Sequence, residues 1–374
     1  MPQRDFYIDR LRTVMTALVI VFHTAITYGS IGGWFYHEIE PTWTPSSILL
    51  TFFVVTIQAF FMGFFFLLAG YFEPASLERK GYARFIIDRC MRLGLPLLAF
   101  GLILGPLTAA MVNFAGGDGF WVTFVWLWRH KEFINGPLWF AQALLIFSLF
   151  YCAWRAVFGA PLSQSERTPK PVPSYRWWLL SVLGVAAASL AIRQIVPAGK
   201  NIIGLQFGYF ASYIFLFAMG ISAWRYDGLC QLTWKNVRPW VITLLIAWPC
   251  MPVGMAVAHS LYGPGKSNFF GGLSWPAILY ACWEPFVACG MIAAWLLLFR
   301  EHMNRPSAFW AWLGRRAYTV YIIHPPVLVG IALLLRGWAA PALVKWGVVG
   351  VMACIACWLL ADPLVRLPGV RRVV

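Results

Sequence analysis

The segment ILLTFFVVTIQAFFMGFFFLLAGYF, residues 48–72, runs for 25 residues without a charged side chain. The hydrocarbon core of a bilayer is about 30 Å thick, and a helix needs about 20 apolar residues to cross it. The apolar residues of this segment are continuous and do not alternate with polar ones. The segment therefore predicts a membrane-spanning helix and not a strand of a β-barrel.

This apolar character extends over the whole chain of 374 residues. Hydrophobic residues make up 60% of the chain and charged residues 11%, and the mean hydropathy is +0.70. Soluble domains contain about 25% charged residues, and disordered chains have low hydrophobicity. The composition therefore excludes an ordinary soluble globule and a disordered chain, and it predicts an all-α, polytopic bundle of transmembrane helices.

Apolar blocks like the first one recur, and we expect ten spans with both termini in the cytoplasm. The positively charged N-terminal segment lacks a small-residue cleavage site, so we expect the first span to be a retained helix and not a signal peptide. The predicted spans are residues 11–29, 48–72, 92–114, 137–158, 176–196, 201–223, 238–259, 272–299, 317–335 and 343–364.

The distribution of basic residues predicts the orientation of these spans. With both termini inside, the inner segments hold 22 Lys and Arg residues and the outer segments hold 7, which accounts for all 29. An excess of basic residues is typical of the cytoplasmic side of a membrane. The residues assigned to the outer segments are Arg129, Lys131, Arg193, Lys200, Lys266, Arg336 and Lys345.

The net charge of +15 has the same origin, together with the attraction of anionic lipids in the bilayer. No basic stripe on a soluble domain is available to hold a duplex, so nucleic acid is not expected as a partner. Eight cysteines in a chain of this length do not predict a disulfide framework. Cys354 and Cys357 are expected to pack on one helix face, and no Cys/His spacing indicates a metal site.

The loops between the predicted spans are short, so the sequence predicts one membrane-embedded domain over residues 1–374. A Pro- and Ser-rich segment near residues 159–175 indicates a flexible cytoplasmic connector between two halves. Two outer loops, 29–47 and 115–136, carry aromatic and charged residues that either anchor the loops at the membrane surface or form a rim that binds an acceptor. These residues are Trp34, Tyr36, His37, Glu38, Glu40, Trp43, Asp118, Trp121, His130 and Glu132.

The first predicted span contains a pair of basic residues, Arg12 and His23. Eleven residues of α-helix correspond to about 1100° of rotation and about 16 Å of rise, so the two side chains share one face. Asp9, one turn before Arg12, can orient the guanidinium. Alone, Arg12 is typical of a positive-inside anchor, and His23 of a hydrogen bond between helices. Their alignment favours a functional pair.

Three further groups of ionisable residues are functional candidates. Arg89 and Arg92 lie beside Asp88 at the inner start of a span, where guanidinium groups can bind phosphates. Glu284 lies inside a span without a nearby Lys or Arg, so it is protonated or its partner comes from another helix. His324 is followed by two prolines, and helix breaks at membrane depth usually line a cavity.

Several motifs occur in an order that resembles one known family. They are RDFYIDRLR at residues 4–12 followed by His23, FFFLLAGY at 64–71, RxxR at Arg89 and Arg92, LWFA at 138–141 and YTVYIIH at 318–324. Together they resemble the acyltransferase 3 family of integral membrane O-acyltransferases. The N-terminal stretch is most similar to the subgroup around the periplasmic glucan succinyltransferase. The family often has Ser where Ala69 stands here, a position that we expect to serve packing.

The resemblance implies a reaction in the bacterial inner membrane. An acyl group, acetyl or succinyl, passes from cytoplasmic acyl-CoA to a hydroxyl of an extracytoplasmic carbohydrate or similar acceptor. By motif match, Arg12, Arg89 and Arg92 are implied to bind the phosphates of CoA, and His23 is implied to be essential.

We expect His23 to be the general base, since an imidazole with an unperturbed pKa of about 6.5 suits proton transfer at neutral pH. A covalent acyl-histidine is the alternative for this residue. Glu284 and His324 are expected to line the transfer cavity and to orient His23 or the acceptor.

Two other functions are compatible with the same polar residues. A proton-coupled or lipid-linked-sugar transporter also uses His and Glu near the middle of the membrane. A structural or sensory membrane protein without catalysis is the third alternative. Acyl transfer in detergent separates the enzyme from the transporter, and protection by acyl-CoA against thermal unfolding separates it from the non-catalytic protein.

Overall fold

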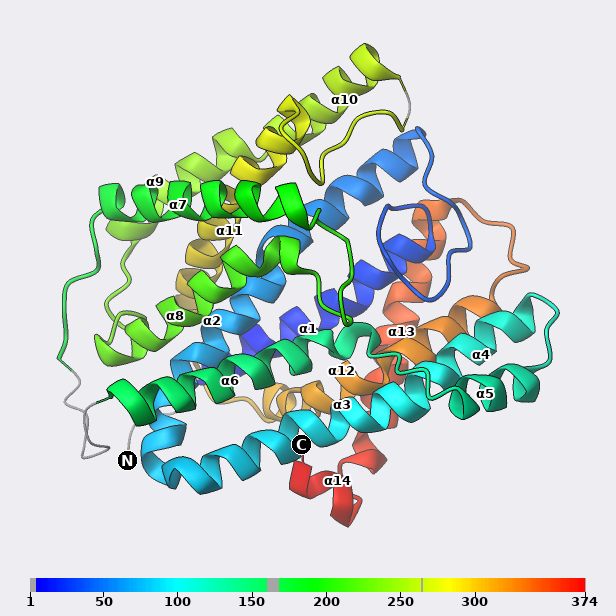
Figure 1. Cartoon of the computed structure of the whole chain (residues 1–374), viewed down its shortest axis with the longest axis horizontal. Coiled ribbons are helices and arrows are strands. Elements are labelled where there is room, and N and C mark those ends of the chain that lie inside the picture. Colours follow the sequence, from blue (N-terminus) through cyan, green and yellow to red (C-terminus); the bar gives the residue numbers. More distant parts are fainter. Residues whose placement is uncertain (1–4, 160–167, 264, 374) are drawn as a thin grey trace. The chain divides into compact units, whose positions relative to one another are not determined.

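The computed structural model describes residues 5–159, 168–263 and 265–373 (Figure 1). Nine helical segments in these residues are long and apolar enough to cross a membrane. They overlap all ten predicted ranges, because the segment Pro45–Ala115, 71 residues long, includes two of them. The prediction of an all-α, polytopic membrane protein is thus confirmed.

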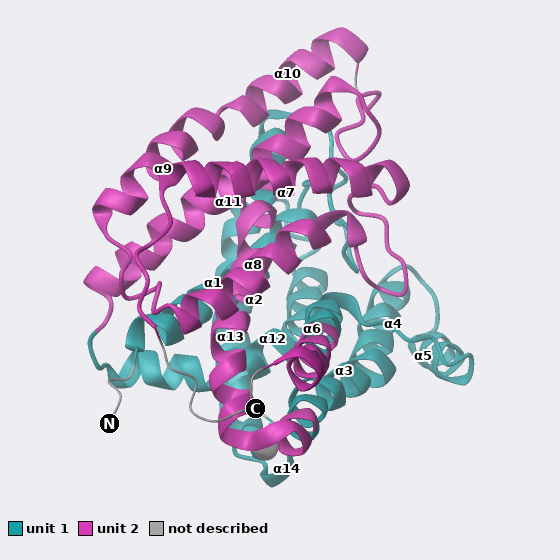
Figure 2. Ribbon diagram, turned by 60° about the vertical axis from the view of Figure 1, so that its left-hand side comes forward, with its two compact units in different colours: residues 1–54, 87–145, 305–374 teal, residues 55–86, 146–304 magenta. Residues whose placement is uncertain are grey.

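The chain forms two compact units, each made of segments that are distant in the sequence (Figure 2). Unit 1 comprises Met1–Val54, Ile87–Leu145 and Arg305–Val374, and unit 2 comprises Val55–Ile86 and Ile146–Asn304. The helices α2 (Pro45–Arg89) and α6 (Trp139–Phe158) each contribute residues to both units.

The Pro- and Ser-rich segment predicted as a connector begins and ends within unit 2. The chain therefore passes between the units at other positions. Residues 160–167 of this segment lie outside the described residues, and the connector stays a prediction.

Three helices form the centre of unit 1: α1 (Phe6–Thr27), α12 (Ala308–Leu334) and α13 (Ala342–Leu364). Gly314 of α12 faces Thr13 of α1, and ten residues further along both helices His324 contacts His23. The two helices therefore run parallel and in constant register.

The third helix, α13, runs in the opposite direction. Near its start, the indole of Trp346 donates a hydrogen bond to the carbonyl of Val21, late in α1, at 3.1 Å. Near its end, Trp358 donates to the carbonyl of Leu313, early in α12, at 3.2 Å. These indole hydrogen bonds fix α13 across both of its neighbours.

The middle segment of unit 1 is irregular, because short π-helical turns alternate with α-helix. Pro96 in α3 (Leu95–Ala99) and Pro106 in α4 (Gly105–Ala115) each lie just after a π-helical turn, and proline lacks the N–H that a continuous helix would use there. The loop predicted at 115–136 contains a helix, α5, which lies beside α4 (Figure 1). The remaining elements of unit 1 are η1 (Cys90–Gly94), α3 (Leu95–Ala99), η2 (Phe100–Leu104), α4 (Gly105–Ala115), α5 (Phe120–Arg129), η3 (Gly136–Leu138) and α14 (Pro368–Val373).

Unit 2 is built around a long helix, α11, which packs against α7 and α9. Part of α2 also belongs to this unit and contains a break at Gly81, whose positive φ of 71° is available to glycine without strain. The other elements are α7 (Tyr175–Ile195), η4 (Phe207–Tyr209), α8 (Phe210–Arg225), α9 (Trp234–Ala247), α10 (Cys250–Tyr262) and α11 (Trp275–His302).

The motif at 64–71 lies where α2 and α8 approach each other closely. A Cβ on Gly70 would stand 2.2 Å from the carbonyl oxygen of Phe217, and one on Gly220 would stand 2.1 Å from that of Leu67. Glycine at both positions lets the two backbones touch, as small residues do where membrane helices pack.

We expect Gly220→Ala to destabilise the protein by about 1–3 kcal/mol, because the added methyl group meets backbone that can move only by separating the helices. The matched control is Gly184→Ala in α7, where a Cβ meets open space. That change should be neutral or stabilising by about 0.5–1 kcal/mol. Thermal unfolding in detergent measures both variants, and equal effects would contradict the proposed helix contact.

Candidate functional site

The imidazoles of His23 and His324 meet in unit 1. Nδ1 of His23 lies 3.3 Å from Nε2 of His324, and the two rings are stacked with an interplanar angle of 20°. His324 is fully buried, whereas His23 is partly exposed. The structure therefore brings together two of the predicted site residues from opposite ends of the chain, and the N-terminal one is accessible.

The hydrogen bonds around this pair assign its protons. Nδ1 of His324 lies 2.7 Å from the carbonyl oxygen of Tyr321, which can only accept, so this nitrogen carries the hydrogen. In neutral His324 the lone pair is then on Nε2, which accepts from Nδ1 of His23. Neutral His23 is consequently left with its lone pair on Nε2.

Trp34 lies over the pair and is nearly parallel to both imidazoles. Its ring stacks on that of His23 with centroids 3.9 Å apart and an angle of 18°. Trp34 is one of the aromatic residues of the predicted outer loop 29–47, and nothing in its sequence position links it to His23. Ring stacking by Trp34 and the hydrogen bond to His324 together fix the orientation of the His23 imidazole.

The loop that carries Trp34 is tied back to the helices of unit 1. The N–H of Glu38 donates to the carbonyl of Thr27 at 2.9 Å, and its carboxylate forms an ion pair with Lys345 of α13. Burial, reinforced by the nearby Glu38 carboxylate, raises the pKa of Tyr36 and of Tyr28 in this loop. Both phenols are therefore neutral at physiological pH.

Lys345 was assigned to an outer segment, but the structure shows it buried in α13. Its partner Glu38 explains this position, because a buried ammonium requires an opposite charge. Lys345 lies within the predicted span 343–364, and a charged residue inside a span indicates an ion pair.

At the other end of α1, Arg12 is exposed. Both Arg12 and His23 lie in one uninterrupted helix, as their spacing predicted. Thr16 and Val19 lie between them on the same face and are buried. A passage from Arg12 to His23 therefore stays a prediction.

The predicted pair Arg89 and Arg92 lies at the junction of α2 and the π-helical η1. The Arg92 side chain is 50% exposed, and its Nε donates to Asp88 at 3.0 Å. The hydroxyl of Tyr318 in α12 donates to the carbonyl of Arg92 at 2.6 Å. This bond connects η1 to the helix that carries His324.

Other arginines near the start of α12 serve the structure. Arg10 is buried and donates to the carbonyl of Arg305, while Arg316 forms an ion pair with Asp362 of α13. These side chains fasten the ends of the three central helices. Arg12 and Arg92 are more exposed than Arg10 and Arg316, so they are the better candidates for binding an anion from solution.

Glu284 lies in unit 2, where it forms an ion pair with Arg193 of α7. Both side chains are 1% exposed. The prediction that its partner comes from another helix is confirmed. Arg193, which the charge count groups with the outer segments, is a buried residue of α7. Since His23 belongs to unit 1, the expected role of Glu284 in orienting it stays a prediction.

The surroundings of the buried ion pair disperse its charge. The guanidinium of Arg193 lies 4.9 Å from the ring centroid of Tyr280 and 5.2 Å from that of Tyr209. Its Nε donates to the carbonyl of Gly208 at 2.9 Å. Such additional contacts are required for a buried ion pair to offset its desolvation cost.

The chain is similar over most of its length to several known proteins. Relatives include the "Glucans biosynthesis protein C" of Escherichia coli (strain SMS-3-5 / SECEC), 27% identical over 343 residues, which covers 87% of this chain and 82% of that protein. The protein of the same name from Shigella dysenteriae serotype 1 (strain Sd197) is similar to the same extent. No solved structure matches the chain significantly.

The family profile described as "Acyltransferase domain" matches residues 5–362. This range includes the His23–His324 pair and every motif from FFFLLAGY onward. The chain therefore belongs to the acyltransferase 3 family.

Proposed function

We propose that this membrane acyltransferase moves an acetyl or succinyl group from cytoplasmic acyl-CoA to a hydroxyl of an extracytoplasmic carbohydrate, in the inner membrane of a bacterium. The observation that carries the proposal is the hydrogen-bond chain from the Tyr321 carbonyl through His324 to His23. It leaves a lone pair on the accessible imidazole, which is what a general base requires. The name of the relatives, glucans biosynthesis protein C, makes a glucan the first acceptor to test.

In the proposed reaction, Nε2 of His23 takes the proton of the acceptor hydroxyl as the oxygen attacks the thioester carbonyl. The new C–O ester bond forms, and the C–S bond breaks. The thiolate of CoA leaves and receives the proton back from Nε2, so the products are the ester and free CoA. During the step His23 is positively charged, and its Nδ1–H continues to donate to His324, which stabilises this charge.

The donor would be held by the basic residues at the start of α1 and at η1. Arg12 and Arg92 are exposed there, and Arg89 is partly exposed. Forked guanidinium groups suit the phosphates of CoA. The rise of about 16 Å from Arg12 to His23 is comparable to the reach of a pantetheine arm. In this proposal the face formed by Thr16 and Val19 opens to admit that arm.

The first test is His23→Ala, which should abolish transfer and leave acyl-CoA binding within about twofold, because the imidazole acts on the proton and not on the donor phosphates. A positioned base contributes about 10²–10⁴-fold. Transfer of labelled acyl groups to a glucan in detergent and mass spectrometry of envelope glycans measure the effect. His302→Ala, at an exposed histidine, is the matched control.

Equal loss of binding and transfer in His23→Ala would contradict the assignment of the base. A wild-type protein that moves a sugar across vesicles but transfers no acyl group in detergent would favour the transporter.

The second test removes the basic residues singly. Arg12→Ala, Arg89→Ala or Arg92→Ala should each weaken acyl-CoA binding by about tenfold or more, because each loses charge-assisted hydrogen bonds to phosphate. Turnover at saturating donor should change less than affinity. Arg129→Ala, an exposed arginine at the end of α5, should leave binding unchanged. Unaltered affinity in all three variants would remove the proposed phosphate site.

The third test addresses His324 as a positioning residue. His324→Ala removes the acceptor of the His23 hydrogen bond and should lower turnover by about 10–100-fold, in the range of other outer partners of functional histidines. His324→Gln offers a side-chain oxygen near the position of Nε2 and should recover part of this loss. If Ala and Gln variants of equal thermal stability were equally impaired, the hydrogen bond would not be the reason for the effect.

A further inference from the structure

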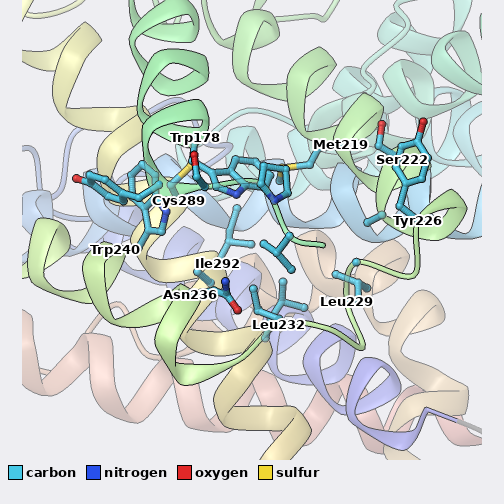
Figure 3. Close-up of a pocket in the computed structure, with 18 of the residues that line it drawn as sticks. Trp178, Met219, Ser222, Tyr226, Leu229, Leu232, Asn236, Trp240, Cys289 and Ile292 are labelled. Carbon is cyan, nitrogen blue, oxygen red and sulfur yellow. The ribbon is translucent and has the colours of Figure 1, made fainter. Parts of the chain in front are cut away.

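Unit 2 contains a cavity of about 440 Å³ that the proposed reaction does not use. Its walls come from α7, α8, α9 and α11, from the segments 170–174 and 226–232, and from Leu67 of α2. In Figure 3, Trp178 and Trp240 lie close to Cys289 on one side, while Ser222 and Tyr226 lie on the opposite side. A cavity of this volume is in the range of small-molecule sites.

The shape of the cavity follows the axes of two helices. On α8 the lining residues run from Leu216 to Ala223, and on α11 they run from Cys289 to Leu296. Seven residues of helix rise about 10 Å, so the cavity, called the slot below, extends over about 10 Å of each helix. Most of its walls are aliphatic or aromatic, which favours a flexible hydrocarbon chain over a polar ligand.

The charged residues that line the slot are all basic. Lys170 and Lys235 line it, and none of the described lining residues is acidic. Lys170 is held in place, since its N–H donates to the carbonyl of Tyr226 at 3.3 Å and its Nζ lies 4.5 Å from the centre of that ring. The charge distribution predicts that both lysines lie on the cytoplasmic side, where anionic lipid headgroups attract basic residues.

We propose that this slot is a binding site for one anionic phospholipid, with an acyl chain between α8 and α11 and the headgroup phosphate at Lys170 and Lys235. An apolar slot that ends in two cations is complementary to an amphiphile with a negative head. Every residue that lines the slot belongs to unit 2, and none of these residues has a role in the proposed acyl transfer.

The experiment uses the full-length protein in phosphatidylcholine nanodiscs that contain phosphatidylglycerol with a photoactivatable group in its acyl chain. After irradiation, mass spectrometry should locate the cross-links mainly on lining residues such as Met219 and Cys289. A phosphatidylcholine analogue should label them several-fold less, and added inorganic phosphate should not compete. Labelling confined to exposed residues such as Leu245, equal labelling by the two lipids, or competition by free phosphate would each overturn the proposal.

Two sets of variants test the two parts of the site. Ala293→Trp fills the slot and should remove the cross-links, whereas Leu298→Trp, on an exposed position of the same helix, should preserve them.

Lys170→Glu and Lys235→Glu should each reduce labelling by phosphatidylglycerol about fivefold, as expected for one basic residue at an anionic surface. Lys200→Glu, at an exposed position outside the slot, is the control. Undiminished labelling in the lysine variants would exclude a headgroup site, even if Ala293→Trp failed to fold.

Discussion

The hydrogen bond between His23 and His324 depends on the parallel pairing of α1 and α12. The organisation of unit 1 follows from this pairing of helices. Constant register places Gly314 against Thr13 at one end and the two imidazoles together at the other. The Tyr321 carbonyl then assigns the proton of His324, and this in turn assigns that of His23. A shift of one helix by a single turn, about 5.4 Å, would separate the imidazoles and leave a buried polar group without its acceptor.

A buried ion pair joins distant segments within each unit. In unit 1, Lys345 pairs with Glu38 and thereby ties the loop that carries Trp34 to α13. In unit 2, Arg193 and Glu284 join α7 to α11 between two tyrosine rings. Removing one member of such a pair leaves an uncompensated buried charge and costs about 3–5 kcal/mol. An ionisable residue inside a span therefore also indicates an ion pair that joins two elements.

The parts that were predictable from sequence are those that local geometry determines. The spans follow from the thickness of the bilayer, and the placement of Arg12 and His23 in one helix follows from helical periodicity. The contacts that could not be predicted join residues that are distant along the chain. Trp34 reaches His23 because Lys345, 307 residues after Glu38, holds the loop. Arg193 is 91 residues from Glu284, and its location inside a predicted span was the available signal. The π-helical turn at Arg92 has no comparable signal in its composition.

Unit 1 draws on the beginning, the middle and the end of the chain, and this order has a consequence for biogenesis. The ribosome releases α1 early and reaches His324 only 301 residues after His23. At 5–20 residues per second, the nascent protein carries the first histidine for about 15–60 s before its partner exists. The His23–His324 contact therefore forms only after the ribosome has passed residue 324, long after α1 has entered the membrane.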